Sequence, residues 1–276
     1  MEIDITEQLG SLAHPKRLAL LRMLIRRYPD DVPAGELASS LDLKANTASN
    51  YLSALKQVGL VTQARQGTSL RYRANTVMLH TVFDELLEGC CQNRPDICQR
   101  PFRQMSIGSS AEQPLNVLFL CMANSARSIM AESLLNRIGA GRFNVFSAGI
   151  APAKEPNTKV LDFLVSKGCE VDGLKSKSME SLVENLDREM DFVITVCDQA
   201  ANEEPVKWPG YPMHAHWGTD DPLSHDSPPD EDHAIERTYE TINARVLAFA
   251  ALPFDELNQL QLQQKLDQLG QWTGPE

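Results

Sequence analysis

The sequence predicts two domains, a mainly α-helical first domain in residues 1–100 and an α/β second domain in residues 115–253. A chain of 276 residues is longer than a usual single domain. Apolar residues recur at helical spacing before residue 59 and then alternate with polar ones, whereas from residue 116 short apolar runs alternate with helical stretches. The second pattern is typical of a doubly wound sheet, for which we expect four parallel strands.

Acidic side chains are concentrated in the second part of the chain. Residues 1–100 carry 12 basic and 11 acidic side chains, and the remainder carries 14 and 26, for a net charge of −11. Because proteins contact DNA phosphates with Lys and Arg, any DNA-binding role belongs to the first part. The acidic second part suits an enzyme acting on a small molecule.

The chain start has neither the basic nor the apolar segment of a signal peptide. The apolar run Leu18–Ile25 contains Arg22 and is shorter than the ~20 residues that a membrane span needs. We therefore expect a cytoplasmic protein with no membrane partner. Its six cysteines should then be reduced thiols, which favours metal, metalloid or redox chemistry over structural disulfides.

The first domain shows a helix-turn-helix pattern. Residues 14–27 have apolar positions every three or four residues, and Pro29 ends this amphipathic helix. Pro33 is well placed at the start of a short helix through Leu41, residues 42–44 form a turn, and residues 45–58 form a longer helix.

A β-hairpin is expected to follow Gly59. Residues 60–66 and 70–74 would form its strands, with the turn at Gly67. Apolar and basic residues alternate in the second strand, so Arg71 and Arg73 should point to solvent, and Arg65 lies near the other side of the turn. Three arginines on such a hairpin indicate a DNA-binding wing, although ordinary solvated charges are the alternative.

These elements carry a family resemblance. The runs His14–Arg17, Glu36–Ala38 and Ser49–Val61 resemble the ArsR/SmtB family of winged-helix repressors, over nearly all of residues 5–90. The resemblance implies a homodimer formed through this domain, operator DNA as partner, and residues 45–58 in the major groove. The residues then expected to contact base edges are Asn46, Thr47, Ser49 and Asn50, and those expected to contact phosphates are Lys44, Arg65, Arg71 and Arg73.

A cysteine cluster lies at the end of the closing helix that begins near Val77. Many members of the family bind metal in or near the recognition helix, which has no cysteine here. Cys90, Cys91 and Cys98 offer three soft thiolates, which suit arsenite as a regulatory ligand. The family includes arsenite sensors with a similar cluster. Zinc, which usually takes a fourth ligand, and ordinary thiols without a ligand are the alternatives.

An oxyanion-binding loop is the central motif of the second domain. After a flexible linker in residues 101–114, the apolar strand 116–120 leads into Cys121, and a helix follows the loop. Such a loop turns its N–H groups inward around an oxyanion, here those of Met122, Ala123, Asn124, Ser125, Ala126, Arg127 and Ser128. Arg127 would clamp two oxygens, Ser128 would donate to the thiolate, and Cys121 would be the nucleophile.

Further segments extend the resemblance. Strands are expected at 143–147 and 191–196 and helices at 157–167 and 232–250. Asp221, in the run His216–Pro222, would be a proton donor or acceptor, although an Asp-Pro turn is common. With the run Ser147–Gly149, residues 115–252 resemble the low-molecular-weight tyrosine phosphatase superfamily, and specifically its arsenate reductase branch.

Two features favour a reductase. The run Phe192–Asp198 resembles the redox segment of the reductases, with Cys197 as second thiol; the alternative is that Cys197 is a small apolar side chain at the end of a strand. Leu223 and Ser224 follow the Asp-Pro pair, where phosphatases of this fold usually have aromatic residues. The rival interpretations are a tyrosine phosphatase fused to a DNA-binding regulator and an oxyanion sensor without turnover.

The resemblance implies attack of Cys121 on arsenate, protonation by Asp221, and release of arsenite as a second thiol attacks the Cys121 sulfur. No tightly bound organic cofactor is expected, only an external thiol reductant, either thioredoxin or glutathione with glutaredoxin. Thioredoxin-coupled members carry a further cysteine where this chain has Glu203–Pro205, so the full three-cysteine relay is in doubt. The tail, residues 254–276, is expected to form an amphipathic helix packed on the domain or on a partner subunit.

Overall fold

The computed structural model describes residues 4–91, 114–139, 141–184, 188–203, 208, 212–224 and 231–272. The chain divides into two compact units, Met1–Gln104 and Met105–Glu276, and each is described by itself. Within the described ranges, no helix combines the length and apolar character needed to cross a membrane.

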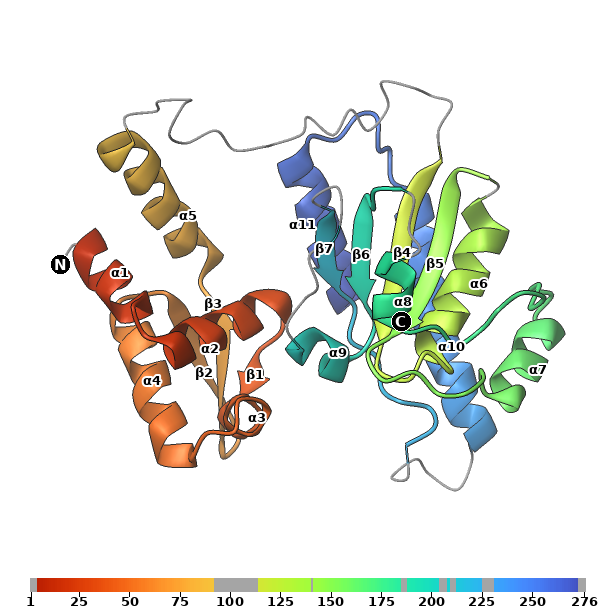
Figure 1. Cartoon of the computed structure of the whole chain (residues 1–276), viewed down its shortest axis with the longest axis horizontal. Helices are drawn as coiled ribbons and strands as arrows, with labels where there is room; N and C mark the ends of the chain where they lie inside the picture. Colours follow the sequence, from red (N-terminus) through yellow and green to blue (C-terminus); the bar gives the residue numbers. More distant parts are fainter. Residues whose placement is uncertain are drawn as a thin grey trace. The chain divides into compact units, whose positions relative to one another are not determined.

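The first unit is a winged helix-turn-helix, as predicted (Figure 1). Its helices are α1 (Ile5–Leu12), α2 (Pro15–Arg26), α3 (Ala34–Ser40), α4 (Ala45–Gln57) and α5 (Thr76–Glu85), the last continuing into the π-helical turn η1 (Leu86–Cys90). Its antiparallel sheet has the order β1 (Val32–Pro33), β3 (Ser69–Ala74) and β2 (Val61–Gln66). Leu20, Leu24, Leu37 and Leu52 are fully buried at its centre.

The second unit contains the predicted four-stranded parallel sheet (Figure 1). Its strands, in spatial order, are β5 (Phe143–Gly149), β4 (Leu115–Cys121), β6 (Phe192–Thr195) and β7 (Met213–His216). Its described helices are α6 (Arg127–Gly139), α7 (Thr158–Ser166), α8 (Met179–Glu184), α9 (Asp198–Asn202), α10 (Glu231–Ala250) and α11 (Gln259–Gln271). The apolar pattern indicated three of these strands, and β7 is the fourth.

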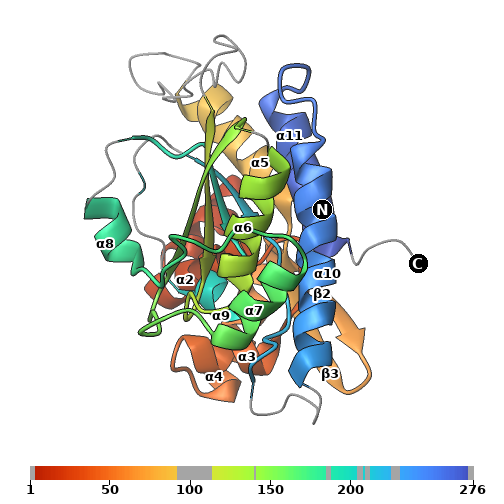
Figure 2. The same cartoon turned by 90° about the vertical axis from the view of Figure 1, so that its right-hand side faces the viewer.

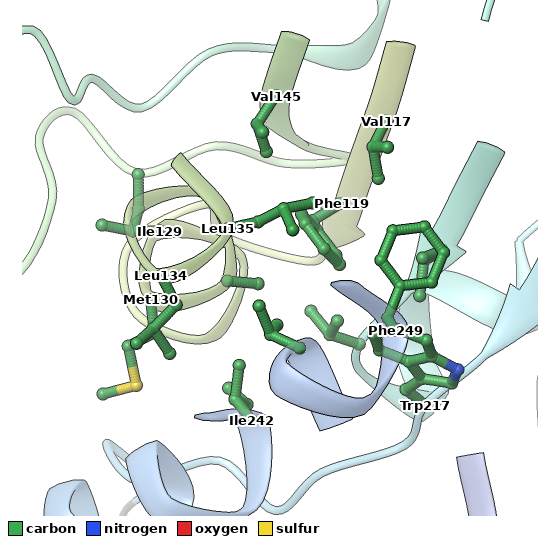
Figure 3. Close-up of a cluster of buried hydrophobic side chains, with 14 of the residues drawn as sticks. Val117, Phe119, Ile129, Met130, Leu134, Leu135, Val145, Trp217, Ile242 and Phe249 are labelled. Carbon is green, nitrogen blue, oxygen red and sulfur yellow. The ribbon is translucent and has the colours of Figure 1, made fainter. Parts of the chain in front are cut away.

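The alternation of side chains along β4 separates two apolar layers. Val117 and Phe119 face α6 and α10 in the larger core, where Phe249 of α10 also lies (Figure 3). Leu118 and Leu120 face the opposite side, which α8 covers (Figure 2). Because both faces of β4 are buried, the strand is a continuous apolar run rather than an alternating one.

The C-terminal helix α11 packs on the second unit. Asn258 is its N-cap, and the side chains of Asn258 and Gln261 each accept a hydrogen bond from the other residue's main-chain N–H. The helix therefore begins after Asn258, a few residues later than Phe254, where the predicted tail begins. Leu262 and Leu266 are fully buried in the larger core. Helix α11 contacts strand β7 and helix α10.

Candidate active site

The loop between β4 and α6 is held with its carbonyl groups turned away from its interior. The carbonyls of the loop accept hydrogen bonds from the segment that follows β5, in the pairs Ile150–Cys121 (3.2 Å), Ala151–Met122 (2.9 Å), Ala153–Ala123 (2.8 Å) and Asn157–Ser125 (3.0 Å). A peptide group whose C=O is fixed outward directs its N–H to the other side. This arrangement makes the loop suitable for cradling an anion.

Asn124 fixes the curvature of the loop. Its φ of 47° lies in the left-handed region, which Asn tolerates better than most residues, and its side chain is fully buried. The side-chain Nδ2 donates to the Oγ atoms of Ser128 (2.9 Å) and Ser147 (2.8 Å), and Oδ1 accepts from the main-chain N of Lys177 (2.7 Å). These three bonds offset the strain of the left-handed conformation.

Cys121 lies at the base of this loop, at the end of β4. Its Sγ is 3.0 Å from the main-chain N of Asn124 and 2.9 Å from the Oγ of Ser128. Helix α6 begins at Arg127, so its positive end lies beside the loop. The main-chain N–H of Asn124 and the N-terminus of α6 both direct positive partial charge toward the Cys121 sulfur.

Arg127 and Asp221 meet across the loop. The Arg127 Nη2 donates to Asp221 Oδ2 at 2.8 Å, and Nη1 donates to the carbonyl of Thr219 at 3.0 Å. The Arg127 side chain is 9% exposed and that of Asp221 is 41% exposed. The structure therefore brings together the predicted oxyanion clamp and the predicted proton donor, which are 94 residues apart in sequence.

Cys197 lies beside the same loop, between β6 and α9. It is fully buried, and burial is the main cause that raises the pKa of its thiol. The charge of Arg127 and main-chain hydrogen bonds from Ala200 and Met122 lower the pKa of Cys197. The charge of Cys121 has the opposite effect and raises the pKa of Cys197. The fold therefore places the second predicted thiol beside the oxyanion loop.

Sequence reasoning missed a buried ion pair behind the loop. Ser147 donates to Glu132, and the Nζ of Lys177 lies 3.2 Å from Glu132 Oε1. Burial raises the pKa of Glu132, while Lys177 and Ser147 lower it. The available signal was a single carboxylate within the apolar helix that follows the loop.

Gly149 enters the sequence prediction only as part of the run Ser147–Gly149. The structure explains why this residue is glycine, because it lies against the oxyanion loop. A Cβ there would lie 2.7 Å from the carbonyl oxygen of Met122 and 3.0 Å from the main-chain N of Asn124. Only a residue without a side chain lets β5 approach the loop this closely.

Helix α4 presents most of the residues predicted to read DNA. Ala48, Leu52 and Leu55 form its buried side. Thr47 is half-buried, and the remaining predicted contacts are exposed, namely Lys44, Asn46, Ser49 and Asn50. The helix thus has a packed face and a polar accessible face, as a recognition helix requires.

The wing differs from the prediction at two arginines. Arg65 is exposed, but Arg71 and Arg73 are half-buried rather than pointing freely into solvent. Arg73 forms a two-pronged ion pair with Asp31 (3.1 and 2.9 Å), and Arg71 donates to the Asp31 carbonyl at 2.9 Å. The cause is the short strand β1, which pairs with β3 and brings Asp31 against the wing.

The described part of the cysteine cluster lies at the end of η1. Cys90 is an exposed free thiol, Cys91 is disulfide-bonded, and Cys98 lies outside the described residues. An arsenite site of three thiolates would require the reduced form of Cys91.

Comparisons with known proteins agree with this geometry. Residues 116–265 match the family described as low molecular weight phosphotyrosine protein phosphatase, and residues 12–64 match a helix-turn-helix domain. The arsenate reductase of Brevibacillus brevis is 31% identical over 139 residues, which are 50% of this chain and 96% of that protein. The arsenate reductase of Bacillus subtilis is 31% identical over 135 residues, or 49% of this chain and 94% of that protein.

Among solved structures, an arsenate reductase from Archaeoglobus fulgidus is 28% identical, with a TM-score of 0.39, and covers 49% of this chain and 99% of that one. The chain belongs to the low molecular weight phosphotyrosine protein phosphatase family, and within it to the arsenate reductases. Its first domain matches a helix-turn-helix domain, so the protein is a fusion of a helix-turn-helix domain with an arsenate reductase domain.

Proposed function

We propose that the second domain reduces arsenate to arsenite through a covalent adduct on Cys121. The observation that carries this proposal is the placement of Cys121, Arg127, Asp221 and Cys197 around one loop. Arsenate has the tetrahedral oxyanion shape that the inward N–H groups and the guanidinium of Arg127 suit.

In the first step, the Cys121 thiolate forms a bond to arsenic, and a hydroxyl group of the arsenate leaves as water after Asp221 donates a proton. The contact between Asp221 and Arg127 supports this role, because it holds the carboxyl group at the loop (2.8 Å). Arg127 and the loop N–H groups offset the negative charge on the arsenate oxygens.

In the second step, the Cys197 thiolate attacks the Cys121 sulfur. A disulfide forms, the electron pair of the S–As bond stays on arsenic, and arsenite leaves. An external thiol, from thioredoxin or from glutathione with glutaredoxin, then supplies the two electrons that reduce the disulfide. The competing route is direct attack of an external thiol on the adduct, in which Cys197 takes no part.

We further propose that the first domain is a homodimeric repressor that arsenite releases from operator DNA. The exposed polar face of α4 and the exposed Arg65 support DNA contact. Val77 and Phe83 of α5 are 77% and 56% exposed, which supports a second subunit covering this helix. Arsenite formed by the second domain would bind Cys90, Cys91 and Cys98, so that one chain produces and senses the same ion.

The enzymatic proposal is tested by arsenate-dependent NADPH oxidation, coupled to thioredoxin or to glutathione with glutaredoxin. Turnover should disappear in Cys121→Ser and persist in Cys169→Ser, a buried cysteine to which we assign no chemistry. Loss in Cys197→Ser with both reductants supports the disulfide route, whereas turnover retained with glutathione favours the competing route. Cleavage of an aryl phosphate without arsenate turnover would identify a phosphatase instead.

The sensing proposal is tested by DNA binding of the reduced protein with and without arsenite. The triple variant with Ser at positions 90, 91 and 98 should bind operator DNA normally and stay bound when arsenite is added. Release of the variant by arsenite would place the sensing site elsewhere.

A further inference from the structure

The catalytic loop that carries Asp221 is tied to a buried arginine on helix α10. Arg245 is 4% exposed. Its Nη1 donates to the carbonyls of Trp217 (2.9 Å) and Gly218 (3.0 Å) and to the Oγ1 of Thr219 (3.1 Å). Three acceptors on consecutive residues fix the path of the chain just before Asp221.

Thr219 connects Arg245 to the oxyanion site. The carbonyl of Thr219 accepts the hydrogen bond from Arg127 Nη1 (3.0 Å), while the other nitrogen of Arg127 holds Asp221 (2.8 Å). The Thr219 Oγ1 in turn donates to the Trp217 carbonyl at 3.0 Å. A shift of residues 217–219 would therefore move both the clamp and the proton donor.

Helix α11 and the residue after it also bind Arg245 and Trp217. The Nε of Arg245 donates to the carbonyl of Trp272 (3.0 Å), just beyond the end of α11. The indole Nε1 of Trp217 donates to the carbonyl of Leu266 (3.1 Å) within α11. At Gly270 the helix approaches so closely that a Cβ would overlap the carbonyl oxygen of His216.

We propose that Arg245 and helix α11 form a brace that positions the catalytic loop, with Arg245 as a positioning residue for arsenate reduction. This inference rests on the proposed roles of Arg127 and Asp221. It assigns a function to the C-terminal tail, which would belong to the working enzyme rather than being an appendage. Because reacting groups must be held within a fraction of an ångström, loss of the brace should lower turnover by about ten- to hundredfold.

Arg245→Met removes the donors while keeping an unbranched side chain of similar length. We expect kcat for arsenate to fall by about ten- to hundredfold, whereas Arg237→Met, at an exposed arginine of the same helix, should leave it unchanged. Arg245→Lys should restore part of the loss. If Arg245→Met lowers the unfolding midpoint but leaves kcat of the folded protein unchanged, Arg245 is merely structural and the proposal is wrong.

A double-mutant comparison tests whether Arg245 acts through the loop. In an Asp221→Asn background, Arg245→Met should lower kcat by a much smaller factor than in the original chain, because the group that Arg245 positions is already impaired. Equal losses in the two backgrounds would overturn the inference. If Asp221→Asn and Arg127→Lys both leave turnover intact, the proposed active site fails, a result distinct from failure of the brace.

Gly270→Ala tests helix α11 without disturbing its own stability. Alanine favours a helix more than glycine does, so we expect any damage to come from the close contacts of the added Cβ with His216 and Trp217. We expect a loss of kcat in Gly270→Ala and none in Gln268→Ala, at an exposed position of the same helix. Unchanged turnover in Gly270→Ala would contradict the role of α11.

Discussion

Replacing Lys177 with Met should expose the cost of burying Glu132. The Glu132 side chain is 10% exposed and that of Lys177 is 31% exposed. Removing one partner of a buried ion pair leaves a charge without compensation, which costs about 3–5 kcal/mol. Because Lys177 reaches partly into solvent, we take the lower end, a loss of about 3 kcal/mol at neutral pH. In a domain of this size, that corresponds to a fall of roughly 6–12 °C in Tm.

The loss should depend on pH in a defined direction. Burial already raises the pKa of Glu132 in the folded state, and removal of Lys177 takes away the main opposing cause. A group with a raised folded pKa favours the folded state below its unfolded pKa, and this contribution is lost as the pH rises through the folded pKa. The deficit of Lys177→Met should therefore be small near the ordinary carboxyl pKa of about 4.3 and reach its full size at neutral pH.

Urea unfolding followed by tryptophan fluorescence measures this effect in the second domain alone, because Trp208, Trp217 and Trp272 all lie there. Lys175→Met, at an exposed lysine, is the matched control and should change the free energy of unfolding little. Combining Lys177→Met with Glu132→Gln should recover most of the loss. A deficit equal at both pH values, or no larger than that of Lys175→Met, would refute the reasoning.

Three further outcomes follow from the site and the wing. Because burial raises the pKa of Cys197, the rate of disulfide formation in a single turnover should rise about tenfold per pH unit through neutral pH, and a pH-independent rate would contradict attack by its thiolate. Gly149→Ala should weaken binding of phosphate, a tetrahedral oxyanion like arsenate, by about tenfold, because its Cβ would displace Met122; unchanged phosphate affinity would show that the loop adjusts to the Cβ without loss of binding. Arg65→Ala should lower operator affinity and reduce the slope of log K against log salt by about one, whereas an unchanged slope would exclude a phosphate contact.

The fold and the oxyanion loop could be predicted because their signals are local. The apolar run of β4, the cysteine after it and the arginine at the start of α6 are contiguous, so their order alone indicates strand, loop and helix. Strand β7 was harder to locate, since its four residues include His214 and His216 and show no clear apolar pattern.

The supporting residues could not be predicted because the fold brings them from distant segments. Glu132 and Lys177 are 45 residues apart, and Arg245 lies 26 residues beyond Thr219. No periodicity links such positions, and an arginine in a helix is most often solvated. The predicted solvent-facing placement of Arg71 and Arg73 was wrong for a similar reason, since Asp31, which pairs with Arg73, is 42 residues away.

The position of helix α11 also protects the sheet from pairing with other chains. Strand β7 is at one end of the sheet order, and such an edge presents unpaired main-chain groups that can recruit another strand. Helix α11 contacts β7, and the side chain of Gln263 donates to the carbonyl of His214 at 2.9 Å. A chain shortened before Asn258 would uncover this edge, and self-association into aggregates would then accompany any loss of activity.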